Sequence, residues 1–182
     1  MREWWDGDGA GAGKRGVSPV KNEPQFRVAV DSDTDVLLEF MRAYYAFDGH
    51  AFDRAKARLA LIALLRDANL GRAWLILDDG KPVGYVVLCF GYSLEWLGCD
   101  AFIDEFYLRE EYRGCGWGRK TMEFVEVAAL KAGIRTLHLE VVRQNETALE
   151  VYRKLGFREH DSTFLSKWIA KEVSKPQRDN KP

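Results

Sequence analysis

The sequence predicts one α/β domain in which helices pack on a single mixed, mostly antiparallel sheet. Apolar runs with strand character alternate along the chain with runs of helical periodicity. An Asp-Gly turn within residues 78–82 joins two of the apolar runs, which is typical of a β-hairpin. Further on, an extended run at residues 101–108 leads into a glycine-rich turn at residues 113–118, and a helical pattern follows. Strand, glycine turn and helix together indicate an α/β layer.

The individual elements follow from spacing and turn chemistry. Phe26, Val28 and Val30 alternate with other residues as in a strand, and Ser32 then offers an N-cap for the first helix. Residues 83–92 form an almost unbroken apolar run, so this strand is expected at the centre of the sheet. We expect six or seven strands, at residues 25–31, 73–77, 83–92, 101–108 and 136–142, with one or two closing strands in residues 157–169. About four helices are expected, at residues 32–44, 52–68, 117–132 and 145–155.

Composition and charge narrow the class of protein. The 182 residues are 47% hydrophobic and 30% charged, which is typical of one globular domain, here expected over residues 23–170. Residues 1–22 are expected to form a disordered leader and residues 171–182 a flexible tail. The net charge of −1 argues against a nucleic-acid-binding protein, since no basic excess neutralises phosphates. No apolar run approaches the ~18 residues of a membrane span, so no membrane partner is expected.

Cysteines and histidines point to a reduced, metal-free protein. The three cysteines show no Cys-x-x-Cys spacing, which favours reduced thiols and a cytoplasmic location. The three histidines do not cluster at the spacing of metal ligands. No metal is therefore expected.

The glycine-rich turn is the first candidate site. Its sequence is Arg-Gly-Cys-Gly-Trp-Gly, and the backbone N–H groups of such a turn at a helix N-terminus can hold a phosphate. No Gly-Lys-Ser/Thr follows, so the turn is not a P-loop, and its glycine spacing does not fit the dinucleotide-binding fingerprint. A β–α connection that binds no ligand is the alternative.

Two further groups of residues are candidates for chemistry. Asp104 and Glu105 are adjacent inside an apolar strand, where unpaired carboxylates are costly to bury. Since strand side chains alternate, we expect them on opposite faces, one toward a site and the other toward a helix or solvent. A structural ion pair is the alternative. Downstream, Asn145 and Tyr152 belong to an Asn-x-x-Ala-x-x-x-Tyr-x-x-x-Gly-Phe array, in which Tyr152 alone would fit a packed core aromatic equally well.

Together these groups resemble the GNAT superfamily of acetyl-CoA-dependent N-acetyltransferases. The similarity rests on Asp-Glu-Phe-Tyr-Leu at residues 104–108, on an Arg-x-x-Gly-x-Gly signature at residues 113–118 and on the later Asn…Tyr…Gly-Phe segment. It covers roughly residues 26–169 and implies a sheet splayed between the fourth and fifth strands, with acetyl-CoA as cosubstrate. Contacts to coenzyme A are then implied for Phe106, Tyr107, Leu108, Arg113, Gly114, Cys115, Gly116, Trp117, Gly118, Arg119 and Asn145.

The resemblance also implies the chemistry. A primary amine is mostly protonated near neutral pH, because its pKa lies near ~10, so a carboxylate must take its proton before it attacks the thioester. Asp104 is the first choice for this base, since we expect it on the same face as Phe106, and Glu105 replaces it if a β-bulge shifts the alternation. Tyr152 is implied as the acid that protonates the departing thiolate. A nucleophilic role for Cys115, at a helix N-terminus, is the alternative to direct attack.

The acceptor is less well defined. Residues 90–98 resemble the corresponding segment of the spermidine/spermine (diamine) N-acetyltransferases, which implies a small amine. Candidates for an aromatic and acidic mouth that would attract a cation are Tyr44, Tyr45, Asp48 and Tyr92. Solvated loop residues are the alternative. A protein acetyltransferase and a non-catalytic acyl-CoA-binding sensor stay open for the whole chain, and a homodimer through residues 157–169 is a further expectation.

Overall fold

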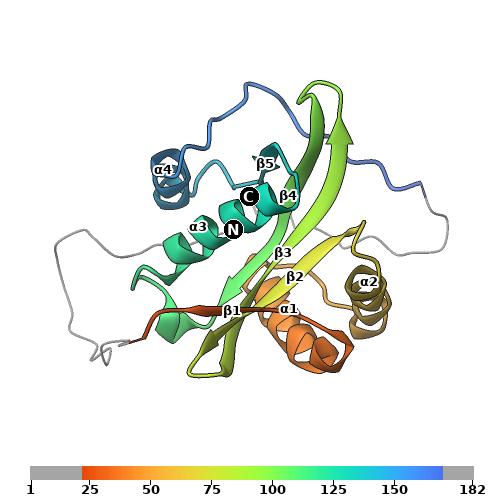
Figure 1. Ribbon diagram of the computed structural model, residues 1–182, viewed down its shortest axis with the longest axis vertical. Coiled ribbons are helices and arrows are strands. Elements are labelled where there is room, and N and C mark those ends of the chain that lie inside the picture. Colours follow the sequence, from red (N-terminus) through yellow and green to blue (C-terminus); the bar gives the residue numbers. More distant parts are fainter. Residues whose placement is uncertain (1–21, 170–182) are drawn as a thin grey trace.

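The computed structural model describes residues 22–169. Nearly all of the predicted leader and the whole predicted tail lie outside the described residues. The helices and strands, shown in Figure 1, are β1 Gln25–Val28, α1 Thr34–Asp48, α2 Arg54–Arg66, β2 Gly71–Asp78, β3 Lys81–Ser93, β4 Gly98–Leu108, α3 Trp117–Lys131, β5 Thr136–His138 and α4 Glu146–Lys154. The α/β class is confirmed.

One sheet of five strands organises the described domain, in the order β1-β2-β3-β4-β5. Strands β1 to β4 pair antiparallel, and β5 pairs with β4 in parallel. The prediction that residues 83–92 form the central strand is confirmed, because β3 has two strands on either side.

The expected count of six or seven strands is not confirmed. The described residues 157–169 form no strand, although they were expected to hold one or two. β5 covers only Thr136–His138 and does not continue to residue 142, so a following strand would find a short ladder to join. Large apolar side chains of the segment stay exposed, namely Phe164, Leu165, Trp168 and Ile169. The expected homodimer through this segment stays a prediction.

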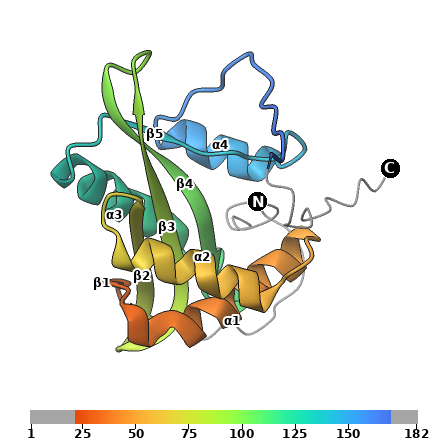
Figure 2. The same cartoon turned by 90° about the vertical axis from the view of Figure 1, so that its right-hand side faces the viewer.

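Helices cover both faces of the sheet (Figures 1 and 2). On one face α1 packs through Phe40, whose ring stacks against Tyr85 of β3 and Tyr107 of β4. On the other face α3 packs through Phe124, whose ring stacks on Phe26 of β1 at 4.1 Å. Because strand side chains alternate, the odd-numbered residues of β3 face α1 and the even-numbered ones face α3. Within residues 22–169, no helix is long and apolar enough to cross a membrane.

The first helix is longer than the sequence pattern predicted. It continues through Asp48, and Gly49 ends it in the left-handed conformation, with a φ of 75°. Tyr44 and Tyr45, one of them expected in a loop, therefore both lie on α1. This places their side chains on a rigid element next to the sheet.

Candidate active site

A β-bulge in β4 sets the direction of the two acidic side chains. Val87 of β3 lies opposite Glu105. The next residue of β3, Leu88, lies opposite Ile103, which leaves Asp104 as an extra residue in the ladder. The predicted strict alternation, with the two acids on opposite faces of the sheet, is therefore wrong. The bulge interrupts the period of two on which that prediction depended.

Both acids lie on the face that α1 covers. Glu105 accepts a hydrogen bond from Tyr85, and Asp104 contacts the thiol of Cys89. Tyr85 and Cys89 are odd-numbered residues of β3, and β3 itself is not bulged there. We expected Asp104 on the same face as Phe106. It instead shares a face with Glu105.

Glu105 lies within a buried cluster of tyrosines. The residue is 8% exposed, and its Oε2 accepts a hydrogen bond of 2.6 Å from the Tyr85 hydroxyl. Tyr45 of α1 also hydrogen-bonds to this carboxylate. Burial raises the pKa of Glu105 to about 7, while the hydroxyl of Tyr85 acts in the opposite direction and the charge of Asp104 adds to the rise. A carboxyl group with a pKa near neutrality can exchange protons at physiological pH.

The tyrosines of this cluster keep their protons. Burial, with the adjacent Glu105 charge, raises the pKa of both Tyr45 and Tyr85 above the usual value. Both hydroxyls therefore act as donors toward the carboxylate. Phe40 stacks on the ring of Tyr85, with ring centroids 6.1 Å apart, and this contact helps to hold the Tyr85 side chain in place.

Asp104 lies at the solvent side of the same cluster. The residue is exposed, and partial loss of solvent around its side chain raises the pKa of Asp104. Contact with Cys89 acts in the opposite direction. Burial raises the pKa of the Cys89 thiol to about 12, so this cysteine stays a protonated, unreactive neighbour.

The glycine-rich turn presents backbone groups instead of side chains. Gly114 and Gly116 take positive φ angles of 68° and 88°, which glycine adopts without strain. Gly116 is the N-cap residue of α3, and within residues 22–169 no side chain caps that helix end. The first N–H groups of α3 are therefore available to an anion, and the exposed turn lets one approach.

Arg113 precedes the turn, but its side chain folds back onto the sheet. Its Nε donates to the Leu108 carbonyl at 2.9 Å, and its guanidinium lies over the rings of Phe47 and Tyr107. Burial lowers the pKa of Arg113. Its backbone N–H donates to the Glu110 carbonyl. Arg113 thus connects α1, β4 and the start of the turn, and its direct contact with a cofactor stays a prediction.

Between the bulge and the turn, β4 has an edge that no described strand covers. β5 pairs only with Asp100, Ala101 and Phe102 of β4. Beyond that point, residues 103–108 of β4 have no strand partner on the β5 side within the described chain. An extended ligand can form backbone hydrogen bonds along such an edge. The edge leads from the acids directly to the glycine turn.

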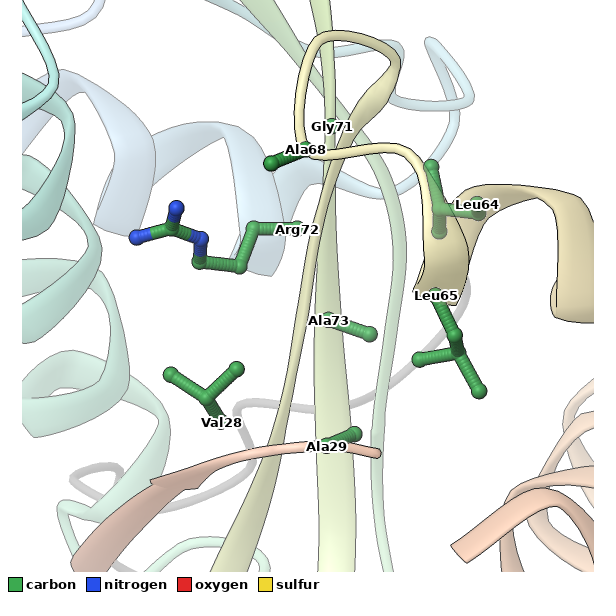
Figure 3. A pocket seen from close by; sticks show the side chains of 8 residues that line it. All are labelled: Val28, Ala29, Leu64, Leu65, Ala68, Gly71, Arg72 and Ala73. Atoms are coloured by element: carbon green, nitrogen blue, oxygen red, sulfur yellow. The ribbon is translucent and has the colours of Figure 1, made fainter. Parts of the chain in front are cut away.

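A separate pocket of about 350 Å³ lies where β1 ends, between β2 and α2 (Figure 3). Arg72 is its one ionisable lining residue, and its side chain points away from Leu64 and Leu65, which come from α2. The pocket contains none of the acids, tyrosines or turn residues described above. Its lining offers no carboxylate, histidine or tyrosine, so we place the site at β4.

Comparison with known proteins identifies the family. The sequence profile of the Acetyltransferase (GNAT) family matches residues 34–157. The chain belongs to the GNAT acetyltransferase family. This family uses acetyl-CoA as cosubstrate, and the open β4 edge with the uncapped α3 terminus fits a ligand that has an extended arm and a pyrophosphate.

Relatives of this GNAT acetyltransferase agree with that assignment. It is 36% identical over 89 residues to the thialysine N-epsilon-acetyltransferase of Bos taurus, covering 46% of this chain and 52% of the relative. The chain thus spans about half the length of the curated relatives it matches. An integron cassette protein from the mobile metagenome of Cole Harbour Salt Marsh has a similar structure, with a TM-score of 0.71 and 34% identity over 80% of this chain and 91% of that one.

A second solved structure has the same fold. A predicted acetyltransferase from Clostridium acetobutylicum, described as a complex with acetyl-CoA, has a TM-score of 0.67 to this GNAT chain. The match covers 79% of this chain and 96% of that one, at 16% identity, so it shows the fold alone.

The two predicted residues of the last helix are both buried in this GNAT domain. Tyr152 on α4 is 2% exposed, and its ring packs edge-on against Phe157. Asn145 is the N-cap of α4, where its Oδ1 accepts a hydrogen bond of 3.0 Å from the Ala148 N–H. The structure thus gives Asn145 a capping role, and the predicted roles toward coenzyme A stay predictions.

The predicted acceptor residues are only partly brought together. Tyr45 contacts Glu105, and Tyr44 lies close enough to Tyr85 to influence its pKa. Tyr92 lies five residues beyond Val87 along β3, which is about 16 Å from the acids at ~3.3 Å per residue. Asp48 ends α1, and its side chain lies outside the described part of the structure.

Tyr85 is the functional residue that the sequence reasoning missed. A signal for it was present, because it is the one hydroxyl-bearing side chain between Val83 and Phe90, in an otherwise apolar run. A buried hydroxyl almost always has a hydrogen-bond partner. The adjacent acids of the next strand were candidates for that partner.

Proposed function

We propose that this GNAT acetyltransferase moves the acetyl group of acetyl-CoA to the primary amine of a small aliphatic substrate, by direct attack in a ternary complex. The observation that supports this most strongly is the buried Glu105 carboxyl group, hydrogen-bonded by Tyr85 and located beside the open edge of β4. A base with a pKa near the working pH is the most effective one. The bulge favours Glu105 over Asp104 for this role, as expected for a shifted alternation.

The proposed reaction needs three proton transfers and no acyl-enzyme. Glu105, directly or through a water molecule, takes a proton from the ammonium group of the acceptor. The neutral nitrogen then attacks the thioester carbonyl, and an N–H group of β4 stabilises the resulting oxyanion, which is typically worth roughly 3 kcal/mol. When the carbon–sulfur bond breaks, the thiolate receives a proton from Tyr152, and the nitrogen, which becomes an amide, returns its second proton to Tyr152 through water. The products are an amide and coenzyme A.

The acceptor is proposed to be cationic and small. Two adjacent acids, Asp104 and Glu105, face the same side as the aromatic residues Tyr44 and Tyr45 of α1. Negative charge and aromatic faces together favour a cation. The Bos taurus relative is named for the ε-amino group of thialysine, an amine of this kind.

A thiol-release assay tests the proposal. The full chain is incubated with acetyl-CoA and a panel of thialysine, lysine, diamines, polyamines and peptides with unblocked N-termini, and free coenzyme A is measured. We expect turnover with one or more of the small diamines or lysine-like amines. Turnover with peptides alone would favour a protein acetyltransferase. Binding of coenzyme A without turnover across the panel would favour an acyl-CoA sensor, and either result would overturn the proposal.

A further inference from the structure

We propose that Tyr85 is a positioning residue for the general base, because its hydroxyl holds one oxygen of the Glu105 carboxylate and directs the other toward the acceptor. The proposal rests on the proposed function of this site. It assigns a specific task to a side chain of β3, whereas the other proposed participants lie on α1, β4, the glycine turn, α3 and α4.

The position of Tyr85 is unusually well fixed. It lies on the central strand, opposite Leu75 on one side and Tyr107 on the other, so its backbone is paired in both directions. The residue is 1% exposed, and the ring of Phe40 stacks on it with an interplanar angle of 7°. The hydroxyl oxygen therefore occupies one place, 2.6 Å from Oε2 of Glu105. A base held by such a partner keeps one rotamer between substrate turnovers.

Glu105 has a second tyrosine neighbour of a different kind. Tyr45 also hydrogen-bonds to the carboxylate, but it lies three residues from the end of α1 and is only partly buried. The end of a helix is less rigid than the centre of a sheet. Tyr85 is therefore the fixed partner, and Tyr45 is the one that an incoming substrate can displace.

The hydrogen bond has a predictable chemical effect. An O–H donor stabilises the ionised carboxylate relative to the protonated acid, so it keeps Glu105 competent as a base to a lower pH. Removal of the donor therefore raises the pKa of Glu105. The substitution leaves the other titratable side chains around Glu105 in place. These side chains are Tyr44, Tyr45, Cys89, Asp104, Tyr107 and, beyond Tyr45, His50.

The test compares Tyr85→Phe with Tyr112→Phe. Phenylalanine keeps the ring that packs on Phe40 and removes only the hydroxyl. Tyr112 is a matched control, because its hydroxyl also donates to a carboxylate, Oδ2 of Asp78 at 2.8 Å, outside the proposed machinery. We expect Tyr85→Phe to move the acidic limb of kcat/KM upward by about one pH unit, a tenfold loss at low pH, as a hydrogen bond to a charged group predicts. The KM of Tyr85→Phe for acetyl-CoA should stay unchanged. The acidic limb of kcat/KM in Tyr112→Phe should also stay where it is in the parent enzyme.

A second readout does not depend on turnover. The protein is labelled with carbon-13 at the glutamate side-chain carboxyl, the Glu105 signal is assigned by its loss in Glu105→Gln, and its titration is followed by NMR. An upward shift of the Glu105 pKa in Tyr85→Phe, with none in Tyr112→Phe, supports the proposal even for a protein that acetylates no amine in the panel. An unchanged titration, or an unchanged acidic limb in an active enzyme, would overturn it. Silence in the amine panel alone would count against the proposed function and not against the Tyr85 assignment.

Discussion

The cluster around Glu105 lies near the C-terminal end of β4, the glycine turn follows that end, and the two are built in opposite ways. The cluster consists of buried side chains with shifted pKa values, in which Glu105 is 8% exposed. The turn consists of exposed backbone groups, and Gly116 has no neighbour within 4 Å of where a Cβ atom would stand. The cluster should therefore be sensitive to the chemistry of its side chains, while the turn should be sensitive only to its backbone conformation.

The Glu105 cluster and the glycine turn also differ in how they are held in place. Glu105 is positioned by Tyr85, a side chain from the neighbouring strand. The turn is positioned from behind, where Arg113 bonds the Leu108 carbonyl and stacks on Phe47 of α1. Tyr85 lies 20 positions from Glu105 in the chain, whereas Arg113 directly precedes the turn that it supports. Four experiments can break or sharpen the comparison.

Replacement of Glu105 by Gln should have the largest effect. The amide keeps the shape of the side chain and can still accept the Tyr85 hydrogen bond, but it cannot take a proton. We expect kcat to fall by roughly 10²–10⁴-fold, the usual contribution of a general base. Acetyl-CoA affinity, measured by calorimetry, should stay within about twofold. Retention of full activity would shift the base to Asp104, for which Asp104→Asn is the companion variant.

The same Glu105→Gln variant should be more stable than the parent at high pH. The pKa of Glu105 is raised to about 7 from its usual 4.5, so its contribution to folding is favourable below pH 4.5 and is lost as the pH rises through 7. Above pH 7 the variant should gain up to about 3 kcal/mol in free energy of unfolding, and close to none at pH 4. Urea unfolding across this range measures the difference. An equal gain at pH 4 and pH 8 would contradict the burial of this charge, and Glu126→Gln, an exposed glutamate on α3, is the control.

Gly116→Ala should weaken cofactor binding by distortion of the turn. The φ of 88° at Gly116 costs a residue with a Cβ atom roughly 1–2 kcal/mol, so part of the population leaves the binding geometry. We expect a rise of about tenfold in the KM for acetyl-CoA with little change in kcat. Gly133 lies just beyond the other end of α3 with a φ of 78°, and Gly133→Ala should cost similar stability without the KM effect. Equal KM values for both variants would remove the turn from the binding site.

Cys115→Ala should have the smallest effect. The thiol is exposed and donates only to the Tyr112 carbonyl at 3.0 Å, while the turn acts through its backbone. A surface substitution usually changes the free energy of unfolding by less than ~0.5 kcal/mol, so the turn should keep its conformation. Activity should therefore stay within about twofold of the parent enzyme. Loss of turnover, together with an acetylated cysteine in the parent protein detected by mass spectrometry, would instead establish an acyl-enzyme. A burst of free coenzyme A on mixing the enzyme with acetyl-CoA would likewise indicate an acyl-enzyme.

Local chemistry was sufficient for the order of the elements from β1 to α4 and for the glycine turn. Glycine is the residue that a left-handed backbone requires, so Gly114 and Gly116 marked the turn without any knowledge of the fold. An unbroken apolar run marked β3 as the central strand, since only a strand covered on both faces can bury every side chain.

The direction of the acids was decided by tertiary structure alone. The bulge at Asp104 depends on the register between β3 and β4, and register arises from pairing across the sheet, not from the residues of one strand. The prediction of closing strands in residues 157–169 was not confirmed for a related reason. β5 ends at His138, so it offers these residues only a short edge with which to pair. The hydrogen-bond partner of Tyr85 was also decided by the pairing of strands. Its hydroxyl needed a partner, and the carboxylate 20 positions away in the chain became that partner only when the two strands paired.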